Sequence, residues 1–345
     1  MHISDFDYEL PETLIAQNPL AERADSRMLV VDRGSQTWAD SKFNALPEYL
    51  NANDALVLNN TRVFPARLIG ERAPSGGAVE LLLIREIETN VWEALARPAR
   101  RLRKGSRIVF GGSRLKAEVI DLLDNGRRVF RFETDEPLDR IIDDLGETPL
   151  PPYIRRGSLG DVHDRDRYQT IYANQRGAIA APTAGLHFNQ NVLREVEARG
   201  VSITEITLHV GYGTFEPVRT DDVRRHRVAP EWSSIPPSAA AEINDTKARG
   251  GRVIAVGTTT TRALESAANA ADRIRTLSGV VDLTIVPGYK FRAVNVLLTN
   301  FHLPRSSLLI LVSAFAGRDL ILDAYQHAVK EGYRFYSYGD CMLIL

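Results

Sequence analysis

The stretch RVIAVGTTTTRALES at 252–266 predicts a buried strand, a Gly-Thr turn and a helix, in that order. Other segments repeat this alternation, since a helical stretch that stops at Gly200 is followed by the strand VSITEITLHV. Further strands and helices are expected at 281–286, 294–299, about 304–316 and 318–331. Alternation of strands and helices is typical of an α/β layer with a largely parallel sheet.

Between about 62 and 148 the sequence changes to short β-type runs separated by turns that contain glycine. One turn, DNG at 124–126, lies between LKAEVIDLL and RRVFRFE and is a signal for a tight hairpin. Short strands at this spacing are typical of a small antiparallel barrel or sandwich. We therefore expect an α/β main domain formed by residues 1–61 and 149–345, with an inserted, barrel-like all-β domain at 62–148.

The composition is that of an ordinary globular chain, with 44% hydrophobic and 25% charged residues and a net charge of −1. The single cysteine, Cys341, excludes an internal disulfide and a cysteine-ligated zinc or iron–sulfur site. The N-terminus lacks the features of a signal peptide, and no apolar run reaches the ~18 residues of a membrane helix. We expect a cytoplasmic monomer with no membrane partner, whose affinity for nucleic acid must come from local patches.

Two turns carry polar groups that suit a small ligand. The turn at 257–261 combines backbone N–H groups with threonine hydroxyls, and Arg262 adds a fork for a carboxylate. In NNTRVFPARL, Asn60 and Arg62 precede the expected domain crossing, where clefts are favoured ligand sites. A capped helix and a solvated arginine explain the two turns equally well. Neither turn has the glycine spacing of G-x-G-x-x-G or the lysine of a Walker A loop, so nicotinamide and ATP chemistry are unsupported.

Three of the seven histidines lie in short turns among small or apolar residues: His187 in AAPTAGLHF, His209 in TLHVGYGTF and His302 in TNFHLP. Histidine exchanges protons near neutral pH, so these turns favour an enzyme that handles protons on a bound small molecule. A histidine on an apolar stretch is more often a core residue, and at least one of the three is expected to be structural.

The acidic candidates are Glu231, Glu265 and Asp340, each next to an apolar or aromatic residue that would make its ionisation sensitive to the surroundings. No grouping of histidines and carboxylates has a reliable metal-ligand spacing, so we expect no metal site.

Residues 97–107, RPARRLRKGSR, carry six basic side chains and no acid. A second basic cluster lies near the expected return to the main domain, at Arg155, Arg156, Arg165 and Arg167. Arginine-rich edges in a nearly neutral protein are typical of phosphate contacts. The alternative is a solvated edge strand that resists aggregation.

With these motifs in order, the chain resembles one family over nearly its whole length, the S-adenosylmethionine:tRNA ribosyltransferase-isomerases of queuosine biosynthesis. The matching segments include LVLNNTRVFPARLIG, GAIAAPTAGLHF, ITLHVGYGTFEPV, RVIAVGTTTTRALESA and GYRFYSYGDCMLIL. The chain departs from the family's pattern at two places. The segment RRHRVAPEW, which contains Glu231, differs from the usual histidine-rich sequence before that glutamate. Asn295 and Cys341 replace an expected Asp and Ala.

The resemblance implies a reaction in which S-adenosylmethionine, as co-substrate, donates its ribosyl group to the 7-aminomethyl-7-deazaguanine at the wobble position of tRNA. Epoxyqueuosine forms, and adenine and methionine leave, without a metal or redox cofactor. A base must take a proton from the ribose carbon next to the sulfonium, with His187 as the first candidate and His209 as the second. The acid for the leaving adenine would be Glu231, Glu265 or His302.

The other implied roles concern binding. Asp340 would hold the cationic aminomethyl group, and Arg62 or Arg262 the methionine carboxylate. The aromatic faces offered to the sulfonium are Tyr212, Phe215 and Tyr338. The remaining substrate-binding candidates are small and polar residues of the same turns: Asn60, Thr183, Gly185, Gly257, Thr258, Thr259 and Asn300. The candidates for gripping the anticodon loop are basic: Arg97, Arg100, Arg101, Arg103, Lys104, Arg155 and Arg156.

Two other interpretations use some of the same features. An S-adenosylmethionine-dependent RNA methyltransferase would release S-adenosylhomocysteine instead of adenine and methionine. A non-catalytic RNA-binding protein would show no turnover, and the clustered histidines argue against it.

Overall fold

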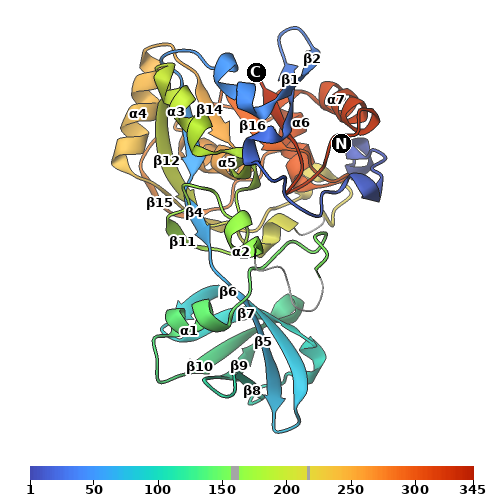
Figure 1. Cartoon of the computed structure of the whole chain (residues 1–345), viewed down its shortest axis with the longest axis vertical. Helices are drawn as coiled ribbons and strands as arrows, with labels where there is room; N and C mark the ends of the chain where they lie inside the picture. The colour runs from blue at the N-terminus through green and yellow to red at the C-terminus, as the bar shows by residue number, and fades with distance from the viewer. Residues whose placement is uncertain (157–162, 216–217) are drawn as a thin grey trace.

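The structure is a computed structural model, and it describes residues 1–156, 163–215 and 218–345. Its larger part is a nine-stranded sheet flanked by helices, and its smaller part is a closed six-stranded barrel joined to one edge of the larger part (Figure 1). The expected fold class, an α/β part with an inserted barrel, is confirmed. No described helix is long and apolar enough to cross a membrane.

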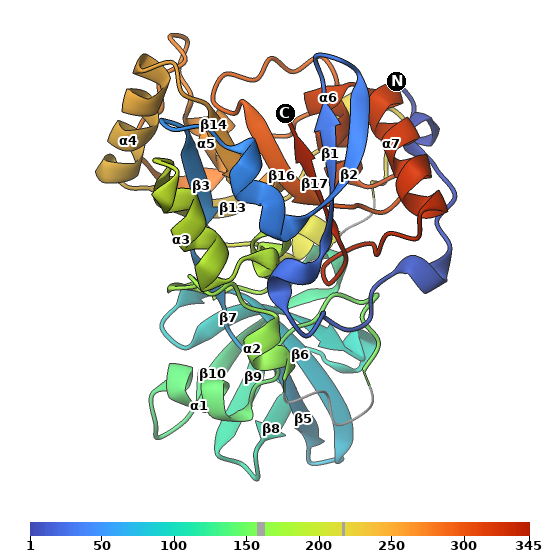
Figure 2. The ribbon, with the colours of Figure 1, turned by 45° about the horizontal axis from the view of Figure 1, so that its top comes forward.

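The large sheet has the strand order β15-β13-β12-β3-β14-β16-β17-β1-β2. Its strands are β1 (Arg27–Asp32), β2 (Thr37–Lys42), β3 (Ala55–Asn59), β12 (Ser202–Leu208), β13 (Glu231–Ile235), β14 (Val253–Val256), β15 (Leu277–Val281), β16 (Val296–Asn300) and β17 (Cys341–Ile344). Strands β16, β17, β1 and β2 lie side by side in Figure 2. The expectation of a largely parallel sheet is wrong, because antiparallel strands flank the parallel centre formed by β12, β3, β14 and β16.

Side chains that alternate along β3 face two different cores, because successive residues of a strand point to opposite faces. Val57 packs into the core beneath α4 (Pro237–Ala248), α5 (Thr258–Ala267), α6 (Ser307–Ala316) and α7 (Arg318–Lys330). Leu56 and Leu58 face the other core, beneath α3 (Gln190–Ala198) and the 3-10 helix η4 (Phe43–Tyr49). The sheet is therefore buried on both faces, which leaves its strand ends as the place for polar chemistry.

The order of the last two helices agrees with the sequence, but α6 begins later than the expected residue 304. Ser306 caps it, because its Oγ accepts a hydrogen bond from the backbone N–H of Leu309 at 3.2 Å. The strand expected at 281–286 lies at Leu277–Val281 instead.

The barrel is antiparallel throughout, with the order β10-β7-β6-β5-β8-β9. Its strands are β5 (Arg67–Ala73), β6 (Gly77–Glu88), β7 (Val91–Arg97), β8 (Arg107–Phe110), β9 (Leu115–Leu122) and β10 (Arg127–Glu133). The hairpin predicted at 124–126 joins β9 to β10. Gly70 is required by close packing, since a Cβ there would lie 2.4 Å from the Phe110 ring. Helix α1 (Leu138–Leu145) packs Ile141 and Ile142 into the barrel core.

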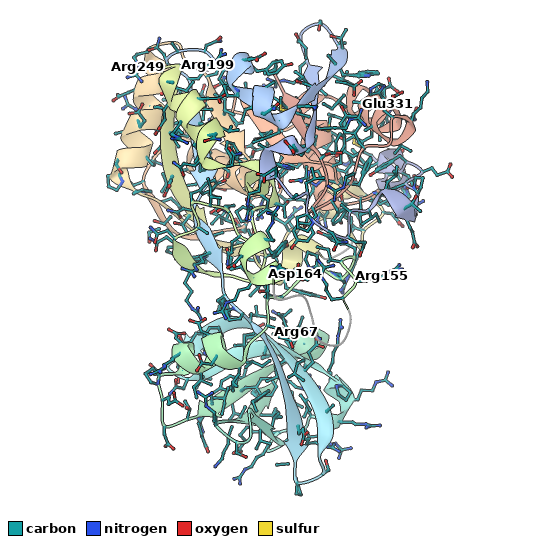
Figure 3. The ribbon with its side chains drawn as sticks, viewed as in Figure 1. Arg67, Arg155, Asp164, Arg199, Arg249 and Glu331 are labelled. Carbon is teal, nitrogen blue, oxygen red and sulfur yellow. The ribbon has the colours of Figure 1, made fainter. Side chains whose placement is uncertain are left out.

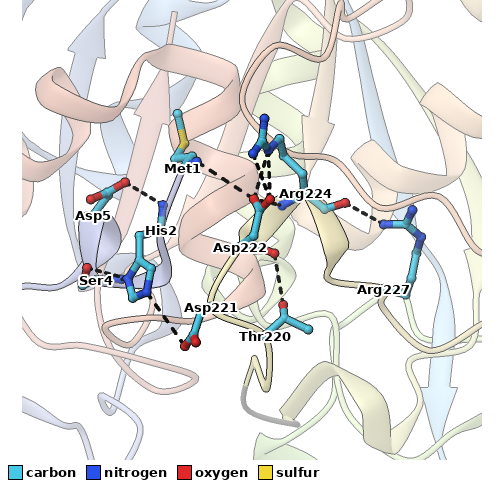
Figure 4. A network of polar contacts seen from close by, with 9 residues as sticks. All are labelled: Met1, His2, Ser4, Asp5, Thr220, Asp221, Asp222, Arg224 and Arg227. Carbon is cyan, nitrogen blue, oxygen red and sulfur yellow. Dashed lines mark hydrogen bonds and ion pairs between the residues drawn. The ribbon is translucent and has the colours of Figure 1, made fainter.

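The chain passes between the two parts through β4 (Thr61–Val63), which pairs with β11 (Gln175–Ala178), and the short helix α2 (Asp164–Arg167) lies nearby (Figure 1). The N-terminus is held against the segment that leads to β13 (Figure 4). There the amino group of Met1 lies 3.9 Å from Asp222, whose carboxylate accepts a hydrogen bond from Arg224 at 2.9 Å.

Candidate active site

The carboxyl ends of four neighbouring parallel strands meet at the edge of the large sheet that faces the barrel. Strands β12, β3, β14 and β16 run in the same direction, so the residues after each strand lie together. Strand β17 is antiparallel to β16, so Asp340 and the turn before it reach the same edge. In open α/β sheets this edge is where ligands bind.

Four hollows lie along this edge, and neighbouring hollows share lining residues. The edge pocket, about 50 Å³, is lined by Thr183, Gly257, Thr258, Thr259, Asn300 and His302, with Tyr153, Tyr336 and Ser337. It shares Val210 with the barrel cleft, a hollow of about 790 Å³ between the sheet edge and the barrel wall. It shares Ser337 with a small pocket beside His187, the histidine pocket, and Leu308 with a pocket beside Arg262, the Arg262 pocket.

The turn after β14 is built to present its backbone to the edge pocket. Gly257 has φ +94°, a left-handed conformation that glycine adopts readily, and α5 starts at the next residue. The hydroxyls of Thr260 and Thr261 bond back to the carbonyls of Val256 and Gly257, so they close the helix turn. Thr258 and Thr259 line the edge pocket, together with the N–H groups that begin the helix.

Asn300 connects the edge pocket to His187. Its Nδ2 donates to His187 Nε2 at 3.2 Å and to the carbonyl of Tyr336 at 3.1 Å. Its Oδ1 is buried and accepts no hydrogen bond from the part of the protein that the structure describes. A buried amide oxygen without a donor is costly, so this atom is a suitable acceptor for a ligand in the pocket.

His187 is enclosed and neutral. Because the Asn300 amide can only donate to Nε2, the ring proton sits on Nδ1 and is given to Ser26 Oγ at 2.7 Å. Burial, and after it the charges of Arg23 and Arg334, lower the pKa of His187 to about 3. Both ring nitrogens are already used, so the first candidate for the base has no free nitrogen for a substrate.

His209 lies in the barrel cleft and is only partly buried. Its ring is stacked on Trp232 with centroids 5.0 Å apart, and a Cβ on Gly177 would lie 2.6 Å from its Nε2. Thr61 Oγ1 lies 2.8 Å from Nδ1 and donates to the carbonyl of Gln175 at 3.5 Å, so Nδ1 carries the ring proton. Nε2 then carries the lone pair, and no residue within 1–156, 163–215 or 218–345 bonds to it. Burial lowers the pKa of His209, which keeps the ring neutral and so able to accept a proton.

His302 lines the edge pocket and is held by its neighbours. Its Nε2 lies 2.9 Å from Thr299 Oγ1, and its backbone N–H donates to Tyr325. Burial lowers its pKa to about 3, so it is neutral and is a poor acid for the leaving adenine.

Glu231 and Arg262 form a buried ion pair between the barrel cleft and the Arg262 pocket. Arg262 Nη1 bonds to Glu231 Oε2, and Glu231 Oε1 accepts the N–H of Gly211 at 2.8 Å. The Nε of Arg262 donates to the carbonyl of Leu283 at 3.0 Å. Its Nη2 is buried without a hydrogen-bond acceptor among the described residues, so one arm of the guanidinium is available to a bound anion.

Several predicted site residues hold the fold together and line none of these four hollows. Glu265 accepts the N–H groups of Arg292, Ala293 and Val294. Asp340 accepts the N–H groups of Arg27 and Arg334, and burial raises its pKa. Both carboxylates are therefore committed to the backbone, which leaves neither free to act as the acid or to hold the aminomethyl group.

Three further predicted residues also lie outside the hollows. Asn60 bonds to Glu205 at 3.0 Å and Thr207 at 2.8 Å, and so joins β3 to β12. A Cβ on Gly185 would lie 2.1 Å from the Tyr172 hydroxyl, so this glycine serves packing. Arg62 is exposed on β4 and contributes to no hollow, so the structure separates it from the edge pocket.

The predicted RNA-binding residues divide into two groups. The basic run, Arg97 with Arg100, Arg101, Arg103 and Lys104, is exposed, and within the described ranges none of its members has an acidic partner. Arg97 is two residues beyond Leu95, a wall residue of the barrel cleft, so it lies about 7 Å farther along the same face. The run therefore continues from the rim of the cleft.

The second predicted RNA-binding group is used differently. Arg156 forms a bidentate ion pair with the buried Asp164, at 2.6 and 2.9 Å, so its prediction as an RNA contact is not supported. Arg155 is exposed and lies 3.1 Å from Glu12 at the lower edge of the larger part (Figure 3). Of the aromatic candidates, Tyr212 lines the barrel cleft and Tyr338 the histidine pocket, whereas the Phe215 side chain lies outside the described structure.

Comparison with known proteins shows which family the chain is similar to. A family model described as queuosine biosynthesis protein matches residues 3–344. The chain belongs to this family. Two curated relatives, from Desulforamulus reducens and Halothermothrix orenii, are each 49% identical over the full length of both chains and are named S-adenosylmethionine:tRNA ribosyltransferase-isomerase. A crystal structure titled S-adenosylmethionine tRNA ribosyltransferase, from Thermotoga maritima, covers 99% of this chain at 36% identity with a TM-score of 0.56.

In this queuosine-family chain, three residues that hold the histidines in place were not identified from the sequence. Ser26 and Thr61 orient the two histidines, and Trp232 supports the ring of His209. Only Trp232 could have been found from the sequence. It directly follows Glu231 in a short strand, and a tryptophan is unusual on a face of a strand that is exposed to solvent. No described group of three or more His, Cys, Asp or Glu residues is arranged to hold a metal ion.

Proposed function

We propose that the chain transfers and isomerises the ribosyl group of S-adenosylmethionine onto the 7-aminomethyl-7-deazaguanine at the wobble position of tRNA. The product is epoxyqueuosine-tRNA, and adenine and methionine are released. Relatives at 49% identity over their full length are named for ribosyl transfer, which supports this reaction over methyl transfer or RNA binding alone.

The observation that carries the proposal is the hollow system at the sheet edge. The edge pocket has room for one or two waters, whereas the barrel cleft, at about 790 Å³, is large enough for a nucleoside. We infer that the nucleoside of S-adenosylmethionine lies at the mouth of the edge pocket, with its ribose hydroxyls toward the turn at Gly257–Thr259. The tRNA base then enters the barrel cleft beside it.

His209 is the residue that we assign as the base. It lies in the large cleft with a lone pair on Nε2, whereas both nitrogens of His187 are bonded inside the protein. His209 takes the proton from the ribose carbon bonded to sulfur, and Thr61 keeps the ring in the reactive tautomer. His187 instead positions Asn300, whose free Oδ1 faces the ligand.

The ion pair of Glu231 and Arg262 is assigned to binding charged groups of the two substrates. Glu231 lines the cleft, where it pairs with Arg262 and accepts the Gly211 N–H, and its carboxylate attracts the cationic sulfonium or aminomethyl group. The free Nη2 of Arg262 is available for the methionine carboxylate. Glu231 thereby takes the role that the sequence suggested for Asp340.

The decisive experiment incubates the protein with S-adenosylmethionine and tRNA that carries the aminomethyl base. We expect adenine and methionine in equal amounts, and none with tRNA that carries guanine at the same position. Formation of S-adenosylhomocysteine would identify a methyltransferase, and no turnover with active substrate tRNA would leave only a binding protein.

We also propose that residues 62–148 fold as the inserted domain, and that the enzyme is a cytoplasmic monomer. Limited proteolysis should leave residues 62–148 as a resistant fragment, and analytical ultracentrifugation should give a mass near the chain's 38.4 kDa.

A further inference from the structure

Three arginines from distant parts of the sequence lie at or near the histidine pocket. Arg23 and Arg167 line it together with Ser26, Leu186 and His187. Arg334 lies close enough to lower the pKa of His187 through its charge. The pocket has a volume of about 30 Å³, which is the space of one water molecule.

The three guanidinium groups are held by backbone carbonyls rather than by acids. Arg23 donates to the carbonyls of Leu186 and Asp166 at 3.1 and 3.0 Å. Arg167 donates to the carbonyls of Ala21 and Leu20, and Arg334 to that of Asn18. Across the described residues, none of the three lies within 4.0 Å of a carboxylate oxygen in an ion pair.

The carboxylates nearby are already committed. Asp340 accepts two backbone N–H groups, and Asp164 is shared between Arg156 and the hydroxyl of Tyr338. Arg156 and Asp164 show how the same region neutralises an arginine that serves only the fold. Arg23, Arg167 and Arg334 form no such ion pair with a described carboxylate, although the charge of Asp340 acts on Arg334 and partly offsets the effect of burial on its pKa.

Two nitrogen atoms of this cluster lack an acceptor. Arg167 Nε and Arg334 Nη1 are buried and make no hydrogen bond within the described structure. Burial lowers the pKa of Arg23 and of Arg334, and the charge of Arg167 lowers the pKa of Arg23 further. Clustered cations of this kind are destabilising unless an anion joins them.

We propose that Arg23, Arg167 and Arg334 form an oxyanion site that binds a phosphodiester of the tRNA backbone close to the reacting base. This inference rests on the proposed function, because it takes tRNA as the substrate. A pocket of this volume fits a phosphate oxygen that enters from outside. The planar guanidinium groups can each bind a phosphate through two parallel hydrogen bonds. The exposed Arg155 lies at the same lower edge as α2, so a further basic side chain lies on this side of the molecule (Figure 3).

The site is also well placed for the reaction. It shares Ser337 with the edge pocket, and His187, which borders it, bonds to Asn300 of that pocket. A phosphate held here would therefore fix the anticodon loop beside the bound co-substrate.

The test compares the triple variant Arg23→Gln/Arg167→Gln/Arg334→Gln with the wild type and with Arg199→Gln. Arg199 is an exposed arginine at the opposite end of the larger part (Figure 3). The probe is a fluorescein-labelled RNA of the anticodon stem-loop, and its Kd is measured by anisotropy over a series of KCl concentrations. We expect the triple variant to bind at least about tenfold more weakly at low salt. Its slope of log K against log salt should be shallower by about 0.7, because one phosphate contact to a single strand contributes ~0.7.

The KM for S-adenosylmethionine is the second measurement, and we expect it to stay within about twofold of the wild type. Unchanged RNA affinity and slope would overturn the proposal, and so would a raised KM with unchanged RNA binding, which would assign the anion to the methionine carboxylate. If the triple variant unfolds, Arg23→Lys and Arg334→Lys retain the charge without the fork. They should keep most of the salt slope and lose affinity.

The RNA-binding measurement requires no turnover, so its result is independent of the adenine-release assay. Arginine-dependent RNA binding without adenine release would leave the oxyanion site standing and would refute the proposed reaction instead.

Discussion

The edge of the large sheet and the wall of the barrel differ in how far the side chains of their ion pairs are exposed to solvent. At the sheet edge, Glu231 and Arg262 are both buried, with side-chain exposures of 3% and 7%. On the barrel wall of the same cleft, Glu93 is buried but its partners Arg127 and Arg85 are 41% and 70% exposed. The sheet edge therefore holds fixed charges suited to chemistry, and the barrel offers mobile charges suited to attracting a polyanion.

The strongest test of this contrast is His209→Ala against His187→Ala. His209→Ala should lower kcat for adenine release by roughly 10²–10⁴, because a positioned base is lost. Its Tm should change little, since the ring is only partly buried. His187→Ala should lower the Tm instead, because Ser26 and Asn300 lose a buried partner, at about 1–3 kcal/mol for each unsatisfied group.

The wild type and an exposed-histidine variant, His2→Ala, serve as controls for both measurements. Wild-type turnover in His209→Ala would eliminate it as the base. If instead His187→Ala kept its Tm and lost activity, the base would lie on the histidine-pocket side of the edge.

The second test removes one carboxylate from each region. Glu231→Gln leaves Arg262 as a buried charge without a counter-ion, and we expect a loss of about 3–5 kcal/mol in the free energy of unfolding. Glu93→Gln should cost clearly less, because its arginine partners can move into water. Urea denaturation of both variants measures the two losses, and equal values would contradict the distinction between the regions.

Local patterns predicted most of the fold. Apolar runs predicted β3, β14 and the barrel strands, and glycine turns such as DNG at 124–126 predicted hairpins. The proportion of parallel strands was not predictable, because β13 and β17 were not expected from the sequence and the direction of each strand pair depends on long-range pairing. Helix α6 begins three residues later than expected, because Ser306 is the residue that caps it.

The site was harder to predict, because its residues come together only through the sheet. The turns at Gly257 and Asn300 were found because polar residues follow buried strands. The difference between His187 and His209 was not visible, because it depends on Ser26, Thr61 and Asn300, which lie far away in the sequence. A contiguous basic run was conspicuous, whereas Arg23, Arg167 and Arg334 are separated by more than a hundred residues.

The third test uses pH, because the stretch 62–148 contains no histidine. The pKa values of His187 and His302 are lowered from 6.5 to about 3 by burial. Below pH 6.5 the unfolded chain binds protons that the folded chain does not, so stability is full above 6.5 and falls toward pH 3. At pH 5.5 the loss from these two groups should be about 2–3 kcal/mol relative to pH 7.5.

Hydrogen exchange, corrected for its intrinsic pH dependence, locates this loss. Protection should fall in the strands of the large sheet and remain in the barrel if the two parts open separately. The variant His302→Gln should flatten the pH dependence of stability by about one proton, and an unchanged dependence would show that His302 is protonated in the folded protein.

The smallest effect is expected from the exposed basic run of the barrel. Replacing Arg97, Arg100, Arg101, Arg103 and Lys104 with Ser should weaken binding of the anticodon stem-loop by about two- to fivefold at physiological salt and flatten its salt dependence. The KM for S-adenosylmethionine should not change. Each of these side chains must be ordered on binding, whereas Arg23, Arg167 and Arg334 are already held by backbone carbonyls, so the effect per residue should be smaller on the barrel. A larger loss from the barrel variant than from the arginine triple variant would reverse the comparison and make the barrel the main RNA-binding surface.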